Sequence, residues 1–200
     1  MHRAESCGLT LPSSGLAYSK PLMSNVRQHM SPAELKKPIL ARVHSLLRPE
    51  GYRKAGSVFS RTSEDVVHLV EIQSSRSNTD FQARFTVNIG VFASAVEHAD
   101  IRDTARPSIP GAHWRWRLGS LSPEKKDVWW ESSTLAESEA AAHQITDRLA
   151  LYGLPALAAI PNLQALAAVW KSGNGPGLTE YQRANFLARL ISTNGRQSVA

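Results

Sequence analysis

The chain has 200 residues, of which 42% are hydrophobic and 20% charged, and its formal net charge is +6 at pH 7. A chain of this size and composition can bury a core of its own without disulfides or a structural metal. The single cysteine, Cys7, excludes an internal disulfide and a cysteine metal cluster, and no apolar run is long enough to span a bilayer, so we expect a cytoplasmic protein with no membrane partner.

The positive charge is not focused on one segment of the folded region. Residues 1–50 hold 7 basic and 3 acidic side chains, residues 51–130 hold 11 and 9, and residues 131–200 hold 5 and 5. Most of the excess therefore lies in the tail and the first helix. Nucleic acid, which a basic surface would attract, is only weakly supported as a partner.

Residues 1–30 are rich in Ser, Gly and Pro without a sustained period, which predicts a disordered tail. Ser31 and Glu34 then form a capping box around Pro32, and apolar residues recur at helical spacing to Leu47, with Pro38 expected to bend the helix. We expect one domain over 31–191 and a second disordered tail over 192–200.

Three strands follow the first helix. The segments 52–61 and 66–73 predict two of them, the first weak because of its small residues. The third, 81–92 (FQARFTVNIGVF), has an apolar residue at every second position, with polar residues between them from Gln82 to Asn88. Its apolar members, expected to face the core, are Phe81, Ala83, Phe85, Val87, Ile89 and Val91. Its polar members predict a second, solvated face.

The rest of the chain predicts two short strands and then helices. Residues 113–118 alternate two tryptophans with basic residues, and 128–130 is a shorter strand. Helices are expected over 133–152, with Gly153 as the stop, and over 154–160, 162–170 and 179–191. The predicted fold is α+β: an antiparallel sheet of about five strands, with the N-terminal helix and the C-terminal helices packed on one face.

Six motifs occur in the order typical of one bacterial family. They are GYRKAGSVFSR (51–61), IQSS (72–75), FTVNIGV (85–91), HWRWRLG (113–119), VWW (128–130) and GLPAL (153–157). The sequence over about 31–170 thereby resembles domain of unknown function 4304. The resemblance implies an α+β domain and brings no established activity and no catalytic residues.

Strand pairing predicts one candidate binding site. Glu71 and Gln73 on one strand, and Arg84, Thr86 and Asn88 on its neighbour, would share a sheet face. Their guanidinium and amide groups suit a peptide, a carboxylate or a phosphate, whereas a plain solvated face is the alternative. The strand that carries Arg115 and Arg117 would extend the same surface if it lay alongside.

The tryptophans of the sheet region are core fillers or a stacking surface. Because Trp129 and Trp130 are adjacent, they point to opposite faces, so one of them is expected outside the core. Beside the arginines, Trp129 could form cation–π contacts with a partner. The binding residues expected from the sequence are Gln73, Arg84, Asn88, Arg117 and Trp129.

No catalytic set emerges from the sequence. The acidic loop with Glu97, His98, Asp100 and Asp103 matches no metal-ligand spacing, His68 reads as a core histidine, and His113 and His143 have no evident carboxylate partner. Nucleophile-elbow, phosphate-loop and dinucleotide motifs do not occur. We expect neither metal nor cofactor.

Two functional hypotheses follow. The leading one is a binding or regulatory module with a protein partner, of which an immunity-type protein is one form. The alternative is a hydrolase or nuclease that uses a histidine or carboxylate with Arg84 on the polar sheet face.

Overall fold

The computed structural model describes residues 30–97, 106–173 and 175–197 of the chain. The elements in chain order are α1 (Pro32–Leu47), β1 (Arg53–Ala55), β2 (Val58–Ser63), β3 (Val66–Ser74), β4 (Ala83–Phe92), the 3-10 turn η1 (Ser94–Val96), β5 (Trp114–Arg117), α2 (Leu118–Leu121), β6 (Trp130–Ser132), α3 (Leu135–Arg148), the π-helical turn η2 (Leu149–Gly153), α4 (Leu154–Ala158), α5 (Leu163–Lys171) and α6 (Glu180–Gln197). The fold is α+β, as the sequence predicts.

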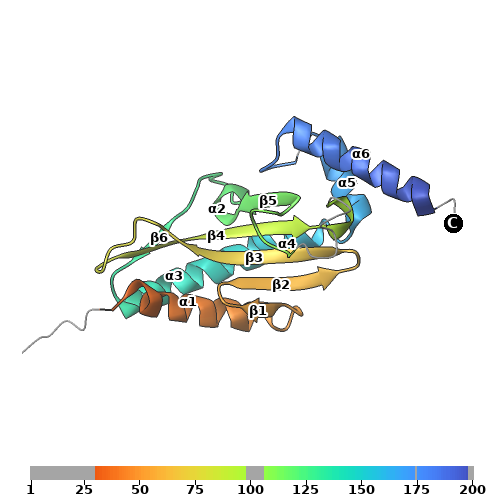
Figure 1. The fold of residues 1–200 in the computed structure, drawn as a ribbon. Helices are drawn as coiled ribbons and strands as arrows, with labels where there is room; N and C mark the ends of the chain where they lie inside the picture. The colour runs from red at the N-terminus through yellow and green to blue at the C-terminus, as the bar shows by residue number, and fades with distance from the viewer. Residues whose placement is uncertain (1–29, 98–105, 174, 198–200) are drawn as a thin grey trace, which may run out of the picture.

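The strands form one antiparallel sheet around β4, the longest of them (Figure 1). The order is β1-β2-β3-β4-β5, and β6 pairs with the first residues of β4. The predicted strand over 52–61 proves to be two strands, β1 and β2, joined by a turn at Gly56, whose φ of +60° suits glycine. This turn is why the sheet has six strands and not about five.

One face of β4 lies in the core, but the alternating sequence begins two residues before the strand does. Phe85, Val87, Ile89 and Val91 are fully buried, as predicted. The expected core position of Phe81 is wrong, because its side chain is 72% exposed. Phe81 belongs to the turn before β4, in which the Thr79 hydroxyl accepts from the backbone N–H groups of Phe81 and Gln82.

Helices cover the core face of the sheet. The helix α1 begins with the predicted capping box, in which Ser31 Oγ accepts from Glu34 N at 3.3 Å and Ser31 N donates to Glu34 Oε2 at 2.8 Å. It runs through Pro38 and buries a stripe of residues four apart. These are Leu35, Ile39, Val43 and Leu47. The stripe packs in the same core as α3, η2 and α4.

Gly153 does not stop the helix that follows β6. Instead α3 passes through η2 directly into α4, and Gly153 has a helical φ of −70°. A Cβ at this position would lie 3.0 Å from Leu149 Cδ2 and 3.1 Å from Leu118 Cδ1. The glycine therefore allows close packing between η2 and α2. The sequence suggests the end of a helix at this position and gives no sign of this packing role.

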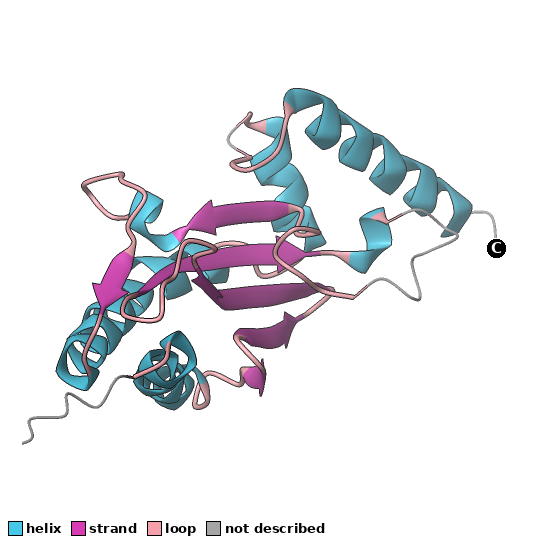
Figure 2. Cartoon of the chain, turned by 60° about the vertical axis from the view of Figure 1, so that its left-hand side comes forward, coloured by secondary structure: helices cyan, strands magenta, loops and turns pink. Residues whose placement is uncertain are grey.

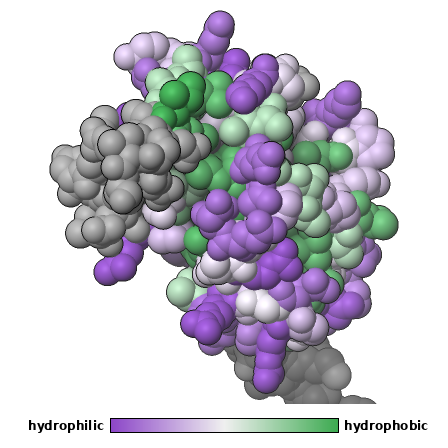
Figure 3. Space-filling view, turned by 90° about the vertical axis from the view of Figure 1, so that its right-hand side faces the viewer, coloured by the Kyte–Doolittle hydropathy of each residue, from purple (hydrophilic) through white to green (hydrophobic). Residues whose placement is uncertain are grey.

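The last two helices lie at one end of the sheet, as the view in Figure 2 makes clear. Trp170 of α5 and Phe186 of α6 pack on each other with ring centroids 5.5 Å apart. The helix α6 continues to Gln197, beyond the predicted end near Ile191. Hydrophilic residues make up much of the surface in the view from this side (Figure 3).

Among the described residues, no single helix combines the length and the apolar composition needed to cross a membrane. One pair of helical segments, Leu135–Ala158 with Leu163–Lys171, reaches that composition only when taken together, and it is bent by 93°.

Candidate functional site

The face of the sheet that the helices leave free, here called the open face, carries the predicted polar residues in register. Asn88 of β4 stands opposite Glu71 of β3 on one side and Arg117 of β5 on the other. Thr86 stands opposite Gln73. The predicted pairing of these strands is therefore confirmed, and β5 does extend the surface.

A pocket of about 530 Å³ lies on the open face. Its floor contains the polar row of Glu71, Asn88 and Arg117, and loops form its walls. The lining residues are Glu71, Gln73, Asn88, Ile109, Pro110, Arg115, Trp116, Arg117, Pro176 and Gly177. The volume lies within the range of roughly 300–1,000 Å³ that ligand pockets occupy.

Hydrogen bonds fix the amide groups of the floor. Asn88 Nδ2 donates to Glu71 Oε2 at 3.0 Å and to Gln73 Oε1 at 2.7 Å. Since a carboxylate only accepts, this arrangement sets the orientation of the Asn88 amide, and Gln73 is left with its Nε2 donors directed elsewhere. Asn88 is only 7% exposed, so the floor is held in place before any ligand arrives.

Arg84 and Trp129 lie outside the pocket. Together with Arg117, which also lines the pocket, they form its rim. The guanidinium carbon of Arg117 lies 5.0 Å from the centroid of the Trp129 ring, and that of Arg84 lies 5.7 Å from it. Trp130 packs in the core, so the predicted division of the adjacent tryptophans is confirmed. Of the five predicted binding residues, the pocket brings together Gln73, Asn88 and Arg117.

Carboxylates neutralise both rim arginines. Arg117 Nη1 donates to the two oxygens of Asp127 at 2.9 and 2.8 Å. Arg84 Nε lies 2.9 Å from Glu131 Oε1, a half-exposed ion pair that is close but not aligned as a hydrogen bond. The rim therefore presents paired charges in place of the positive field that a polyanion would need.

The open face is less solvated than its sequence pattern predicts. Thr86 is buried because the loop before β6 crosses it, and its hydroxyl donates to the Val128 carbonyl at 2.9 Å. The far end of the face is apolar, where Leu69 and Phe92 pack under Ile109 and Ala112. The expectation of a solvated face is wrong for Thr86, and the polar row of Glu71, Asn88 and Arg117 forms the pocket floor.

The histidines with buried side chains each have both ring nitrogens bonded to the protein. Arg61 donates to His68 Nδ1 at 3.2 Å, so His68 Nε2 carries the proton that it donates to the Ile160 carbonyl at 2.8 Å. Burial lowers the pKa of His68, which remains the core histidine that the sequence predicts.

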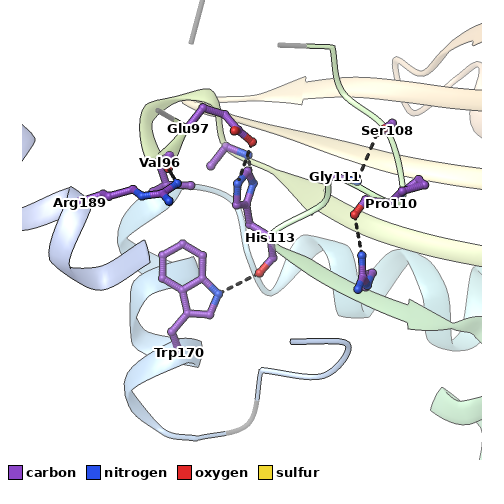
Figure 4. A network of polar contacts seen from close by, with 10 residues as sticks. Val96, Glu97, Ser108, Pro110, Gly111, His113, Trp170 and Arg189 are labelled. Atoms are coloured by element: carbon purple, nitrogen blue, oxygen red, sulfur yellow. Dashed lines mark hydrogen bonds and ion pairs between the residues drawn. The ribbon is translucent and has the colours of Figure 1, made fainter. Parts of the chain in front are cut away.

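His113 has a carboxylate partner that the sequence does not reveal (Figure 4). Its Nδ1 accepts from Ala93 N at 3.1 Å, and its Nε2 lies 3.1 Å from Glu97 Oε1. Burial lowers the pKa of His113 to about 4, and the nearby Arg189 guanidinium adds to this effect, so a neutral ring donates to Glu97. Both nitrogens are occupied, which leaves none to act as a general base.

The predicted acidic loop contributes Glu97 to the described structure, while His98, Asp100 and Asp103 lie outside the described residues. Within the described ranges, His, Cys, Asp and Glu side chains form no group of three that could hold a metal ion.

Sequence reasoning missed most of the pocket walls. Ile109 and Pro110 come from a loop, and Pro176 and Gly177 come from the segment between α5 and α6. The Gly-Pro-Gly run at 175–177 signals a turn, but no local pattern places it against β5.

Fold and site together define an α+β domain whose antiparallel sheet carries helices on one face and a polar pocket on the other. Residues 43–159 match the model of the family described as a domain of unknown function (DUF4304), and the chain belongs to this family. The match includes every strand of the described sheet, whereas α5, α6 and the Pro176–Gly177 wall lie after it. Comparisons with curated proteins and with solved structures found no match.

Proposed function

We propose that this chain is a cytoplasmic binding or regulatory module that holds a segment of a protein partner in the open-face pocket. The observation that carries the proposal is the polar floor of Glu71, Gln73 and Asn88, fixed by internal hydrogen bonds and enclosed by loops on the free face of a rigid sheet. Sites that bind with little reorganisation have this character.

The pocket walls support a macromolecular partner. Ile109, Pro110 and Pro176 offer apolar surface beside the polar floor, a mixture typical of interfaces that bind peptides. The paired rim charges favour a protein over nucleic acid. An immunity-type protein, which binds one target protein, is a module of this kind.

The hydrolase alternative receives less support from the geometry. Arg84 is paired with Glu131 on the rim, outside the pocket, and His68 and His113 use both ring nitrogens within the protein. The carboxylate that lines the pocket, Glu71, already accepts from Asn88.

Affinity capture from the source organism tests the proposal. The full chain is compared with Asn88→Ala/Arg115→Met, which alters the pocket, and with Glu139→Ala/His143→Ala, which alters the groove between α1 and α3. We expect the pocket variant to retain at most about a tenth of the partner, since lost hydrogen bonds to charged groups cost roughly 1.5–3 kcal/mol. The groove variant should capture as much as the wild type.

Thermal melts establish that each variant is folded, and Arg115→Met alone replaces the double variant if removal of Asn88 unfolds the chain. A partner held equally by the wild type and the pocket variant would overturn the assignment of the pocket.

A further inference from the structure

We propose that the pocket recognises a carboxylate group of the partner and that Arg115 is the residue that pairs with it. This inference rests on the pocket being the binding site, as proposed above. It names the chemistry of the partner and assigns a role to a residue outside the predicted site.

Charge pairing distinguishes Arg115 from Arg117, the other arginine that lines the pocket. Arg117 forms an ion pair with Asp127, and Glu71 accepts a hydrogen bond from the Asn88 amide. Among the described residues no carboxylate forms an ion pair with Arg115. Its Nη1 donates to a neutral group, the Pro110 carbonyl, at 2.6 Å.

Two loops hold the Arg115 side chain in place over the pocket. A Cβ on Gly177, whose φ is +74°, would overlap Arg115 Cγ and lie 2.9 Å from Arg115 O, so this turn packs directly against the aliphatic part of the arginine. On β4 the opposite residue is Gly90, where a Cβ would lie 2.9 Å from Ala112 Cβ. The absence of both side chains lets the loops close around Arg115.

A clamped guanidinium is suited to a carboxylate. It presents five N–H donors in a planar fork, of which the Pro110 carbonyl takes one, and parallel donors match the two oxygens of a carboxylate. Gln73 lines the same pocket, and its bond to Asn88 uses the oxygen of its side-chain amide and not the nitrogen.

Because Glu71 lines the pocket together with Arg115, a monoanion suits the site better than a dianion does. A phosphate, at about −1.5 to −2, would bring excess negative charge beside Glu71, which also lines the pocket. The carboxylate could come from a chain end or from an acidic side chain, and the experiment separates these sources.

The test is a titration of the isotope-labelled full chain, followed by nuclear magnetic resonance. The probes are N-acetylglycine, the α-amide of N-acetylaspartic acid, the neutral N-acetylglycinamide and inorganic phosphate. We expect saturable shifts of pocket amides with one of the two carboxylates, at a dissociation constant on the order of 1–10 mM for so small a probe. Tighter binding of N-acetylglycine indicates a chain end, and tighter binding of the aspartate derivative indicates a side chain.

Variants and neutral probes make the result decisive. The wild type should bind N-acetylglycinamide at least about tenfold more weakly than the preferred carboxylate. Arg115→Met should bind that carboxylate at least about tenfold more weakly than the wild type does. Gly177→Ala, which displaces Arg115, should weaken binding as well, while Arg42→Met in the helix groove should not change it. Phosphate that binds more tightly than both carboxylates, amide and carboxylate that bind equally, or Arg115→Met that binds as the wild type would each overturn the proposal.

The titration and the capture experiment fail independently. If the pocket variant loses its partner but neither carboxylate binds, the binding function stands and the carboxylate chemistry is wrong. If the carboxylate binds through Arg115 while capture is unaffected by the pocket variant, the anion site stands and the proposed protein-binding function is wrong.

Discussion

Replacing Phe85 with alanine is expected to lower the free energy of unfolding by about 3–5 kcal/mol, the usual cost of truncating a buried phenylalanine. Phe85 is fully buried on the core face of β4, where it pairs with Ser74 of β3 and Trp130 of β6. The loss combines the transfer of the ring to water with the cavity that remains under the helices. Urea unfolding of the variant and the wild type measures it.

The matched control is Phe81→Ala, four residues earlier in the same alternating stretch. Because Phe81 is 72% exposed, its truncation should change the free energy of unfolding by less than about 1 kcal/mol. Similar losses for the two variants would contradict the placement of the strand start at Ala83.

Acidification is expected to destabilise the protein through His113. The folded-state pKa of about 4 lies below the ordinary value of 6.5, so between these pH values the unfolded chain binds more protons than the folded one. The contribution of the neutral His113 ring to the free energy of unfolding is fully present above pH 6.5 and is lost as the pH falls through 4. A shift of this size corresponds to about 3 kcal/mol.

The measurement compares the free energy of unfolding at several pH values from 7 to 4 for the wild type and His113→Gln. Gln retains an amide that can bond to Ala93 N or to Glu97. We expect the loss of free energy of unfolding between pH 7 and 4 to be about 3 kcal/mol smaller in this variant than in the wild type. His143→Gln, at an exposed position of α3, is the matched control. A wild-type slope in His113→Gln would contradict the buried neutral state of His113.

The sequence predicts the parts of the structure that depend on local pattern. Alternation identifies β4, and the short polar connection from β3 implies an antiparallel neighbour, which together place Glu71 and Asn88 on one sheet face; the register that sets them opposite each other is seen in the structure. The limits of the pattern are also local. The residues of a turn can continue an alternation by chance. Phe81 is such a residue, because the pattern assigns it to the core face but the structure places it in an exposed turn.

The features that escaped prediction depend on contacts distant in sequence. Glu97 reaches His113 because η1 and the start of β5 meet at the end of the sheet, and Trp170 donates to the His113 carbonyl from 57 residues further along. The wall at Gly177 is positioned by the docking of α5 and α6. Neither spacing nor composition encodes such neighbours, so Arg115 is recognisable as the clamped residue of the pocket only in the folded chain.

The most direct test of the open-face pocket is amide hydrogen exchange of the full chain, with and without the captured partner. If the partner occupies the pocket, exchange should slow in β5 and in the segment around Gly177, and should stay unchanged along the exposed sides of α1 and α3. Protection confined to α1 and α3, with β5 exchanging as in the free protein, would contradict the account.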